Sequence, residues 1–338
     1  MQIYENVSLK LHSTMRLGGT ARYCCTVTNE EDLLEAVEFA SSKHAPLRAI
    51  GSGSNIIWRD EGFSGLLIIV NIMGYELITN TTIRYGAGVV WDDAVKISVD
   101  KNLTGIETLS LIPGTVGATP IQNVGAYGCE VIDTIVSVRA YDTHQKSFVE
   151  LTNEECRFAY RMSRFKSDDS GRFIITAVTF ELSESAPKQP FYESLQSYFD
   201  TNAITAYSLQ QVRDAVIAIR SAKLPDPTKI ANNGSFFANP VIEEPHLRGL
   251  LTDYPDIKYW PLEGGKVKIA AGWLLEQAGF KDYHDSDTGM ATWPTQSLVL
   301  INEHASSAQQ LLQFKQKIVS AVHEKFNIIL EQEPELLP

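Results

Sequence analysis

The stretch PGTVGATPIQNVGAYG, residues 113–128, restricts what this chain can fold into more than any other segment. It holds four glycines and two prolines and has no charged side chain. Glycine costs about 1 kcal/mol and proline about 3 kcal/mol in the interior of a helix, and the apolar residues do not alternate as they do in a strand. The segment is therefore predicted to be a long loop of small, neutral residues, a surface that a ligand can approach closely.

A second glycine-rich loop, GSGSN at residues 51–55, follows the predicted strand in PLRAIGSGSNIIW. Free backbone N–H groups in such a loop can hold phosphate without help from Lys or Arg. The spacing is not that of a Rossmann loop, because Ile56 stands where the third glycine of G-x-G-x-x-G belongs. GAGVVW at 86–91 fails in the same way, and no P-loop sequence occurs. Spacing alone leaves the loop open to interpretation as an ordinary tight turn.

Composition limits the classes of partner. The 338 residues exceed what one core usually carries, so more than one domain is expected. The net charge of −12 argues against nucleic acid or an anionic membrane as the main partner. An anionic small molecule is not excluded, because it contacts only its own pocket.

Neither the N-terminus nor the apolar runs predict export or a membrane span. MQIYENVSLKLHS lacks the basic and apolar regions of a signal peptide. The longest apolar run, residues 65–74, is far shorter than the ~20 residues that a membrane helix needs. No cysteine belongs to a C-x-x-C pair. We expect a cytoplasmic protein with four reduced thiols, those of Cys24, Cys25, Cys129 and Cys156.

Periodicity predicts a mixed α+β chain without internal repeats. A small α/β unit is predicted over residues 1–70, with Thr28 or Asn29 capping its helix. Ser208 and Gln211 form a predicted capping box, and LPDP after that helix is typical of a linker. Helices are predicted at 28–44, 91–101, 208–225, 267–280 and 306–326, and strands at 65–71, 82–88, 131–141, 145–151, 173–182, 297–303 and 327–331.

Residues that could carry chemistry are few when each is taken alone. Seven histidines are scattered without an H-x-x-x-H pair, so no metal site is predicted. Ser235 in NNGSFFANP is compatible with a turn followed by a core anchor. CRFAYRMSRFK at 156–166 interleaves four basic residues with aromatic ones, which is compatible with a solvated amphipathic strand. Nucleic-acid binding would need more such patches and a less acidic chain.

Taken in order, eight segments resemble one family along essentially the whole chain, that of the UDP-N-acetylenolpyruvoylglucosamine reductases. These segments are GSGSN, PGTVGATPIQNVGAYG, CRFAYR, KLPDP, NNGSFFANP, AAGWLLEQAG, LVLIN and the LE near the C-terminus. Chance agreement of eight ordered motifs is not credible.

The family's fold is an FAD-binding portion of the vanillyl-alcohol-oxidase type, made of two α/β subdomains, plus an α+β substrate domain. The resemblance implies subdomain 1 at residues 1–70, subdomain 2 at 71–223 and the substrate domain at 224–330. The C-terminal segment 331–338 is expected to pack back on subdomain 1.

The resemblance also implies the activity, that of an FAD-dependent UDP-N-acetylmuramate dehydrogenase in peptidoglycan precursor synthesis. NADPH would reduce non-covalently bound FAD and leave. A hydride would then reach C3 of the enolpyruvyl group of UDP-N-acetylglucosamine enolpyruvate and a proton would reach C2, giving UDP-N-acetylmuramate. The cofactor supplies the hydride chemistry, and the protein orients the substrate.

By motif position, the two glycine-rich loops are implied to hold FAD through their backbone. The implied cofactor-binding residues are Gly51, Ser52, Gly53, Ser54, Asn55, Pro113, Gly114, Gly117, Ala118, Gln122, Asn123 and Gly125. A larger residue at the glycine positions is expected to clash with the cofactor.

Three residues are implied to act on the substrate directly. Ser235 matches the proton donor, and Arg161 with Glu331 matches the pair that stabilises the enolate. An Arg guanidinium offers two parallel donors to a carboxylate. The chain departs from the usual L-E-P-E by reading LEQEPE, so Glu333 is the alternative; Glu331 is preferred because it follows NIIL without a gap.

The resemblance assigns further residues to the UDP-sugar. The implied set is Tyr127, Tyr192, Arg220, Lys223, Asn239 and Gln296. Tyr192, in QPFYESL, resembles the tyrosine on a loop that marks the longer family subtype. Members of the family are often monomeric, so a monomer is expected.

Two rival interpretations remain at this point. One is another flavin oxidoreductase of the same fold that oxidises an alcohol or aldonolactone, although the Ser235 and Glu331 motifs argue against it. The other is a UDP-sugar sensor without catalysis, which would lack flavin absorbance.

Overall fold

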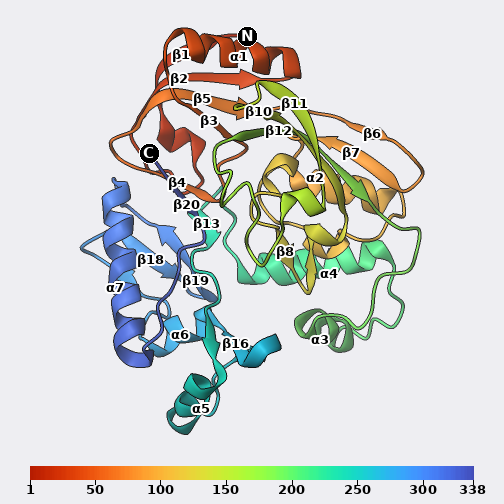
Figure 1. Ribbon diagram of the computed structural model, residues 1–338. Coiled ribbons are helices and arrows are strands. Elements are labelled where there is room, and N and C mark those ends of the chain that lie inside the picture. The colour runs from red at the N-terminus through yellow and green to blue at the C-terminus, as the bar shows by residue number, and fades with distance from the viewer. The chain divides into compact units, whose positions relative to one another are not determined.

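A computed structural model describes residues 1–338 and divides the chain into two compact units (Figure 1). The first unit contains Met1–Val7, Ala21–Gly53 and Phe63–Ala222, and the second contains Ser8–Thr20, Ser54–Gly62 and Lys223–Pro338. The division falls within the GSGSN loop, whose first three residues belong to the first unit. The three-part division at residues 70 and 223 stays a prediction.

The first unit begins with a four-stranded sheet in the order β1-β2-β5-β3, with α1 along one face (Figure 1). Its elements are β1 (Ile3–Ser8), β2 (Thr20–Val27), α1 (Glu30–Ser42), β3 (Leu47–Ile50) and β5 (Phe63–Val70). The helix predicted at 28–44 and the strand at 65–71 are confirmed, and the cap is Asn29, whose side chain accepts from Asp32 N. Since β2, β5 and β3 run parallel, the loops that follow them lie at one edge of the sheet.

A second, antiparallel sheet of the first unit has the order β11-β10-β12-β7-β6. Its strands are β6 (Tyr75–Leu77), β7 (Thr82–Gly86), β10 (Ile135–Asp142), β11 (Ser147–Thr152) and β12 (Phe173–Glu181), and α2 spans Trp91–Asp100. The predictions at 82–88, 91–101, 145–151 and 173–182 are confirmed. The strand predicted from residue 131 begins only at Ile135, because Glu130 and Asp133 cap each other and bend Val131–Asp133 into a 3-10 turn.

The segment 113–128 is a loop, as predicted. It contains one 3-10 turn at Val116–Ala118 and ends in the small hairpin of β8 (Gly125–Ala126) and β9 (Cys129–Glu130). Residues 156–166 are not the amphipathic strand that the sequence suggested. They form turns, because Arg157 and Arg161 take left-handed backbone angles with φ of 50° and 53°, which end a strand.

Two further helices, α3 (Glu193–Thr201) and α4 (Leu209–Lys223), share an apolar cluster. The capping box predicted for α4 is confirmed, since Gln211 N donates to Ser208 Oγ and Ser208 N donates to Gln211 Oε1. The cluster contains Leu195, Phe199, Val212, Ala215 and Val216.

The second unit packs α6 and α7 against an antiparallel sheet ordered β13-β19-β18-β17 (Figure 1). The strand predicted at 297–303 and the helix at 306–326 are confirmed. The elements are β13 (Ala231–Ser235), α6 (Ala271–Gln277), β17 (His284–Asp285), β18 (Met290–Trp293), β19 (Gln296–Asn302) and α7 (Ala308–Phe326). A three-stranded sheet adds β14 (Val241–Glu243), β15 (Tyr259–Pro261) and β16 (Lys266–Ile269), with α5 (Glu244–Asp253).

Two predictions in this unit are wrong at their boundaries. The helix predicted at 267–280 begins only at Ala271, because the alternation of polar and apolar residues in Lys266–Ile269 suits a strand between two neighbours. Residues 327–331 are not a strand. Asn327 ends α7 in a left-handed conformation, and the final strand is β20 (Glu335–Leu337), which pairs with β4 (Ile56–Trp58).

The four cysteines form no disulfide. Among the helices, none combines the length and the apolar character needed to cross a bilayer.

One ion pair in the first unit predicts how stability responds to acid. Asp142 is 1% exposed, and its carboxylate accepts hydrogen bonds from Arg172 Nε at 3.0 Å and from Arg172 Nη2 at 2.6 Å. These hydrogen bonds, against the opposing effect of burial, lower the pKa of Asp142 to about 2. The unfolded carboxyl titrates near pH 4, roughly, so the pair stabilises the fold above that pH and the contribution is lost as the pH falls towards 2.

We expect Asp142→Asn to lower the free energy of unfolding at pH 7 by on the order of 1–2 kcal/mol, discounted because Arg172 is partly exposed. Urea unfolding of the two proteins at several pH values measures the difference. The difference should stay constant down to about pH 4 and shrink as the pH falls from there towards 2; a difference that stays constant below about pH 4 contradicts the assignment.

Candidate active site

The two glycine-rich loops are packed against each other within the first unit. A Cβ on Gly51 would overlap the Thr115 hydroxyl, and a Cβ on Gly117 would lie 2.6 Å from Ala87 Cβ. The glycines at these two positions are therefore required by contacts inside the protein. The second loop is held in place by its own backbone bonds as well, since Gly117 N donates to Ala87 O at 2.9 Å and Ala118 N to Thr115 O at 3.0 Å. Gly51 lies where β3 ends, at the carboxyl edge of the sheet.

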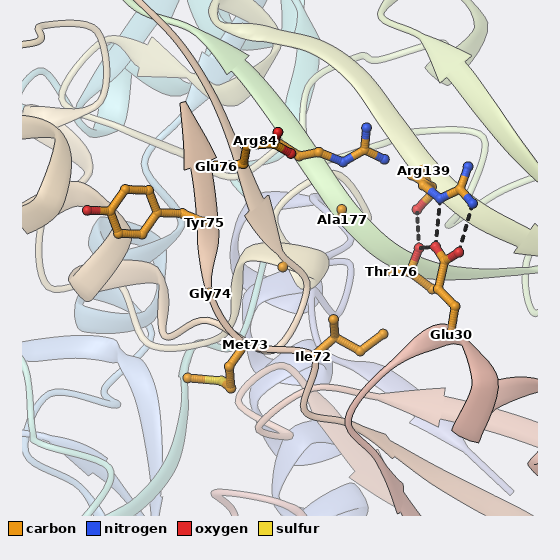
Figure 2. A pocket seen from close by; sticks show the side chains of 11 residues that line it. Glu30, Ile72, Met73, Gly74, Tyr75, Glu76, Arg84, Arg139, Thr176 and Ala177 are labelled. Carbon is orange, nitrogen blue, oxygen red and sulfur yellow. Dashed lines mark hydrogen bonds and ion pairs between the residues drawn. The ribbon is translucent and has the colours of Figure 1, made fainter. Parts of the chain in front are cut away.

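A pocket of about 590 Å³ opens at the same edge of the parallel sheet (Figure 2). It is lined by the residue that follows the cap of α1, by the segment after β5 and by strands of the second sheet. The lining residues are Glu30, Ile72, Met73, Gly74, Tyr75, Glu76, Arg84, Gly86, Arg139, Thr176 and Ala177. Its volume is in the range of small-molecule sites.

The charges on one wall of the pocket are paired. Arg139 donates through Nε and Nη2 to the two oxygens of Glu30, at 2.6 and 2.7 Å, and Thr176 Oγ1 donates to Glu30 at 2.8 Å (Figure 2). The Arg139 hydrogen bonds lower the pKa of Glu30 despite its burial. An ion pair thus forms this wall of the pocket. The apolar side chains of Ile72 and Ala177 also line the pocket. The pocket at this edge, beside the two glycine-rich loops, is of a size that fits part of an FAD molecule.

Arg161 is fastened to the far end of the 113–128 loop. Its Nη2 donates to Gly125 O at 2.8 Å, and its Nη1 lies 4.0 Å from Glu130 Oε1. Glu130 also accepts from Asn123 Nδ2 at 2.8 Å. The structure thus brings together CRFAYR and the glycine-rich loop, which are separate in the sequence. Glu130 was not singled out from the sequence, where only its position two residues beyond the loop signalled it.

The Asn123 side chain forms hydrogen bonds that stabilise the 113–128 loop. It is 1% exposed, its Oδ1 accepts from Ile132 N at 3.0 Å, and its Nδ2 also donates to Ala159 O at 3.2 Å. All three groups lie within the first unit. Asn123 therefore holds the loop in shape, and its amide is used by these protein contacts.

Tyr127, Tyr192 and Arg220 form a second cluster in the first unit. The two tyrosine rings are 6.0 Å apart in an edge-on arrangement, and Tyr127 is hydrogen-bonded to Arg220. Burial raises the pKa of Tyr127 and lowers that of Arg220, and their mutual contact opposes both shifts. Arg220 Nε is buried without a hydrogen-bond partner. A buried, unpaired guanidinium donor requires an acceptor, which an anionic ligand can supply.

Asn239 and Gln296 lie at the start of α6 in the second unit, and Lys223 is linked through its backbone to the residue before Gln296. Asn239 Oδ1 accepts a hydrogen bond from Ala271 N at 2.9 Å. The Gln296 side chain packs against Gly272, where an added Cβ would lie 3.1 Å from Gln296 Oε1. Thr295, beside Gln296, donates to Lys223 O at 2.7 Å. Burial, and then the charge of Lys258, lowers the pKa of Lys223.

Ser235 and the LEQE segment meet in the second unit through the backbone. Ser235 ends β13, and two residues later Phe237 bridges Gln332. Ala238 N donates to Glu331 O at 3.0 Å, and Glu333 N donates to Phe236 O at 2.9 Å. Directly opposite residues in such a ladder share a face, so Glu331 and Glu333 both project from the face opposite to Phe237. Orientation along the strand does not separate them.

Asn233 holds the backbone just before Ser235. Its Nδ2 donates to Ser54 O at 3.3 Å, Ile56 O at 3.1 Å and Thr14 Oγ1 at 3.2 Å, all within the second unit. The end of the GSGSN loop and the start of the Ser235 turn are thereby connected. Nothing in the sequence pattern of NNGSFF signalled this contact.

Glycine-rich loops at the carboxyl edge of a parallel sheet, with an adjoining pocket, define a nucleotide-binding protein. A family model described as FAD binding domain matches residues 21–147. The chain is thus a flavoprotein of that class.

A second family model, described as UDP-N-acetylenolpyruvoylglucosamine reductase, C-terminal domain, matches residues 226–337. The chain is 38% identical over 330 residues to UDP-N-acetylenolpyruvoylglucosamine reductase from Ralstonia nicotianae, covering 96% of each protein. It is 40% identical over 336 residues to that of Dechloromonas aromatica, covering 97% of this chain and 98% of the relative. The chain belongs to the UDP-N-acetylenolpyruvoylglucosamine reductase family and is an FAD-dependent oxidoreductase.

The fold agrees with this assignment. The crystal structure of UDP-N-acetylenolpyruvylglucosamine reductase from Thermus caldophilus matches with a TM-score of 0.70 at 24% identity, covering all of both chains. The α+β fold class, with an FAD-binding portion and a C-terminal domain, is confirmed.

The contact between the two loops generates a prediction. We expect Gly51→Ala to weaken FAD binding by at least about tenfold, or about 1.4 kcal/mol, because the added methyl displaces Thr115 and with it the start of the second loop. The double variant Gly51→Ala/Thr115→Ala removes the overlapping hydroxyl and should recover most of the affinity. Quenching of flavin fluorescence by the apoprotein measures the dissociation constant.

Gly249→Ala is the matched control, since Gly249 lies inside α5 with no atom within 4 Å of an added Cβ. It should leave FAD binding unchanged. A Gly51→Ala protein that binds FAD as tightly as the Gly249→Ala control shows that the loop contact is unimportant.

Proposed function

We propose that this chain reduces the enolpyruvyl group of UDP-N-acetylglucosamine enolpyruvate to give UDP-N-acetylmuramate for peptidoglycan synthesis, with NADPH as the hydride donor. One observation carries the proposal. The whole-length family match assigns an FAD-binding segment and a reductase C-terminal segment to the same chain.

Bound FAD supplies a group that accepts a hydride from NADPH and passes it to the substrate. The first loop, Gly51, Ser52, Gly53, Ser54 and Asn55, would hold its diphosphate through the backbone. Pro113, Gly114, Gly117 and Ala118 would line the cofactor with small residues, since the N–H groups of Gly117 and Ala118 already donate to Ala87 O and Thr115 O. The pocket beside Glu30, where Ile72 and Ala177 line the wall next to the ion pair, would hold the adenosine end. Gln122, Asn123 and Gly125 hold the second loop in shape. No covalent attachment is involved.

Ser235 delivers the proton to C2 of the substrate. A serine hydroxyl is a weak acid, so it donates only to a strongly basic carbon centre, and its role depends on precise placement. Its position at the end of β13, next to the buried pair Phe236 and Phe237, supports such placement.

Arg161 and Glu331 stabilise the negative charge that develops on the substrate carboxylate. The bond from Arg161 to Gly125 O fixes the guanidinium, and a fixed donor is more effective than one that must reorganise. Glu331 acts as a hydrogen-bonding partner, in protonated form or through a bridging donor, since two bare carboxylates repel.

Arg220 and Lys223 bind the diphosphate of the UDP-sugar, and Tyr127, Tyr192, Asn239 and Gln296 contact the rest of it. Burial disfavours the charge on both cations. A diphosphate compensates for that cost, which is why an acidic protein can bind an acidic substrate. Arg220 Nε, which has no partner inside the protein, supports this role.

We further propose that the protein acts as a monomer in the cytoplasm, where thiols such as its four free cysteines stay reduced. Sedimentation equilibrium tests the first statement, and a stable dimer at micromolar concentration contradicts it.

The activity is tested by adding UDP-N-acetylglucosamine enolpyruvate to the purified protein with NADPH. We expect equimolar NADPH oxidation and UDP-N-acetylmuramate formation, together with flavin absorbance between about 350 and 500 nm from bound FAD. Peroxide formation from a sugar acid without any use of NADPH supports the rival oxidase.

Ser235→Ala should leave the NADPH half-reaction intact and slow the substrate half-reaction by ~10²–10⁴-fold, because no positioned proton reaches C2. Stopped-flow absorbance follows the two half-reactions separately. Equal slowing of both halves assigns Ser235 a structural role only.

Glu331→Gln should slow the substrate half-reaction with little change in UDP-sugar binding, since its interaction forms only as charge develops. Glu333→Gln should leave both the rate of the substrate half-reaction and the affinity for the UDP-sugar nearly unchanged. If the Glu333 variant is the inactive one, the carboxylate that stabilises the charge lies two residues further along the chain.

A further inference from the structure

An ion pair in the first unit lies outside all the roles assigned so far. Arg213 of α4 is 6% exposed and donates through Nη1 and Nη2 to the two oxygens of Asp92 at the start of α2, both at 2.7 Å. Burial alone would raise the pKa of Asp92, and the bonds from Arg213 and from the Leu111 N–H outweigh it and hold that pKa below its usual range. The pair is therefore fully charged at neutral pH.

The pair reaches the start of the glycine-rich loop directly. Arg213 Nη1 donates to Ser110 Oγ at 2.9 Å, and Leu111 N donates to Asp92 Oδ1. Leu111 has a φ of 58°, a left-handed conformation that a leucine adopts only when its surroundings impose it. The loop assigned to FAD begins two residues later, at Pro113.

Trp91, next to Asp92, forms hydrogen bonds to residues on either side of Leu111 in the sequence. Its Nε1 donates to Leu109 O at 2.9 Å, and its backbone N donates to Gly114 O at 3.1 Å. The first turn of α2 is thus attached to the loop before and after Leu111, and Asp92 is the charged member of this attachment. A change at Asp92 or Arg213 is therefore transmitted to Gly114 through one or two hydrogen bonds.

Helix α4 also contacts the other end of the loop. Arg220 lies seven residues after Arg213, close to two helical turns, so the two guanidinium groups leave α4 on similar sides. Arg220 is hydrogen-bonded to Tyr127, one residue before the last glycine of the loop. Through Arg213, α4 is connected to Ser110, three residues before the loop, and through Arg220 it is connected to Tyr127 within the loop.

From these contacts we propose that Asp92 and Arg213 are positioning residues. Their bidentate pair fixes the entry of the 113–128 loop to α4, and so sets the affinity for FAD and, through Arg220, the affinity for the UDP-sugar together. The inference rests on the proposed placement of the two ligands at these residues.

The chemistry of the pair favours positioning over plain stabilisation. A buried ion pair contributes little more than well-packed apolar residues of the same volume. A planar guanidinium that donates two parallel hydrogen bonds does fix distance and orientation, which a lysine cannot reproduce. On the buried side of α4, Arg213 lies beside Val212 and Val216, both 0% exposed, so the charge is retained where an apolar side chain would pack.

The test compares Arg213→Met and Arg213→Lys with a matched control, Arg172→Met. Arg172 also donates two bonds to a buried aspartate, Asp142, in the same unit, and it has no role in binding. Each protein is measured for the FAD dissociation constant of the apoprotein, for KM and kcat with the UDP-sugar, and for the free energy of unfolding in urea.

We expect Arg213→Met to raise the FAD dissociation constant and the KM for the UDP-sugar together, by about 3- to 30-fold each, the range typical of residues that act on a ligand through other groups. The change in kcat should be smaller, because Ser235 and Glu331 belong to the other unit and Arg161 is held at the far end of the loop by Gly125 O. Arg213→Lys keeps the charge without the paired donors and should give intermediate values. Arg172→Met should lose stability with both constants unchanged.

A double variant, Asp92→Asn/Arg213→Met, should be no worse than the more affected single variant if the two residues act as a pair. The proposal is overturned if the Arg213 variants lose stability like Arg172→Met while both constants stay within about twofold of the parent. Arg213→Lys provides the same comparison if Arg213→Met does not fold.

Arg220→Met separates this inference from the proposed function. Unchanged UDP-sugar affinity in Arg220→Met shows that the placement of the UDP-sugar is wrong, whatever Arg213 does. Weakened affinity in Arg220→Met together with unchanged constants in the Arg213 variants rejects the positioning role alone.

Discussion

The close approach of the two glycine-rich loops is the constraint on which the rest of the first unit depends. Gly51 lies on Thr115 and Gly117 on Ala87, at distances that exclude any side chain. This contact joins the carboxyl edge of the parallel sheet to the loop that carries Tyr127 and that Arg161 holds at Gly125. A ligand bound at the edge therefore meets backbone from two loops whose shape was fixed before it arrived, and binding costs little further ordering.

Binding of an anionic substrate depends on the charges inside its site and not on the net charge of the chain. The net charge is −12, yet the groups assigned to the diphosphate are two cations, the half-buried Arg220 and the more exposed Lys223, whose pKa partial desolvation lowers. The long-range field repels an anion weakly across salt water, whereas a desolvated cation at contact distance attracts it strongly. The same local reasoning explains why the paired charges of Glu30 and Arg139 leave the pocket wall without a net charge.

Most of the helices could be predicted from the sequence because their signals are local, whereas fewer than half of the strands could be. Asn29 before an apolar stripe and Ser208 with Gln211 are caps that act within one turn, and both occur as predicted. Lys266–Ile269 was assigned to a helix because its strand exists only through its two neighbours. The Asp92–Arg213 pair joins residues 121 positions apart, and no spacing rule predicts it. Spacing alone also left GSGSN open to a simple turn, and only the order of motifs along the chain indicated FAD.

The choice between Glu331 and Glu333 shows how far local geometry reaches. In the antiparallel pairing, Glu333 lies opposite Phe236 and Glu331 opposite Ala238, so Glu333 is closer along the ladder to Ser235. Both carboxylates project from the same face of the pairing, so side-chain direction does not show which of them acts on the substrate. Accessibility does separate them: Glu331 is exposed, whereas Glu333 is half-buried and has partners within the protein. An exposed carboxylate can reach a ligand without first giving up partners inside the protein, whereas Glu333 would have to release them, and this difference is compatible with the role proposed for Glu331.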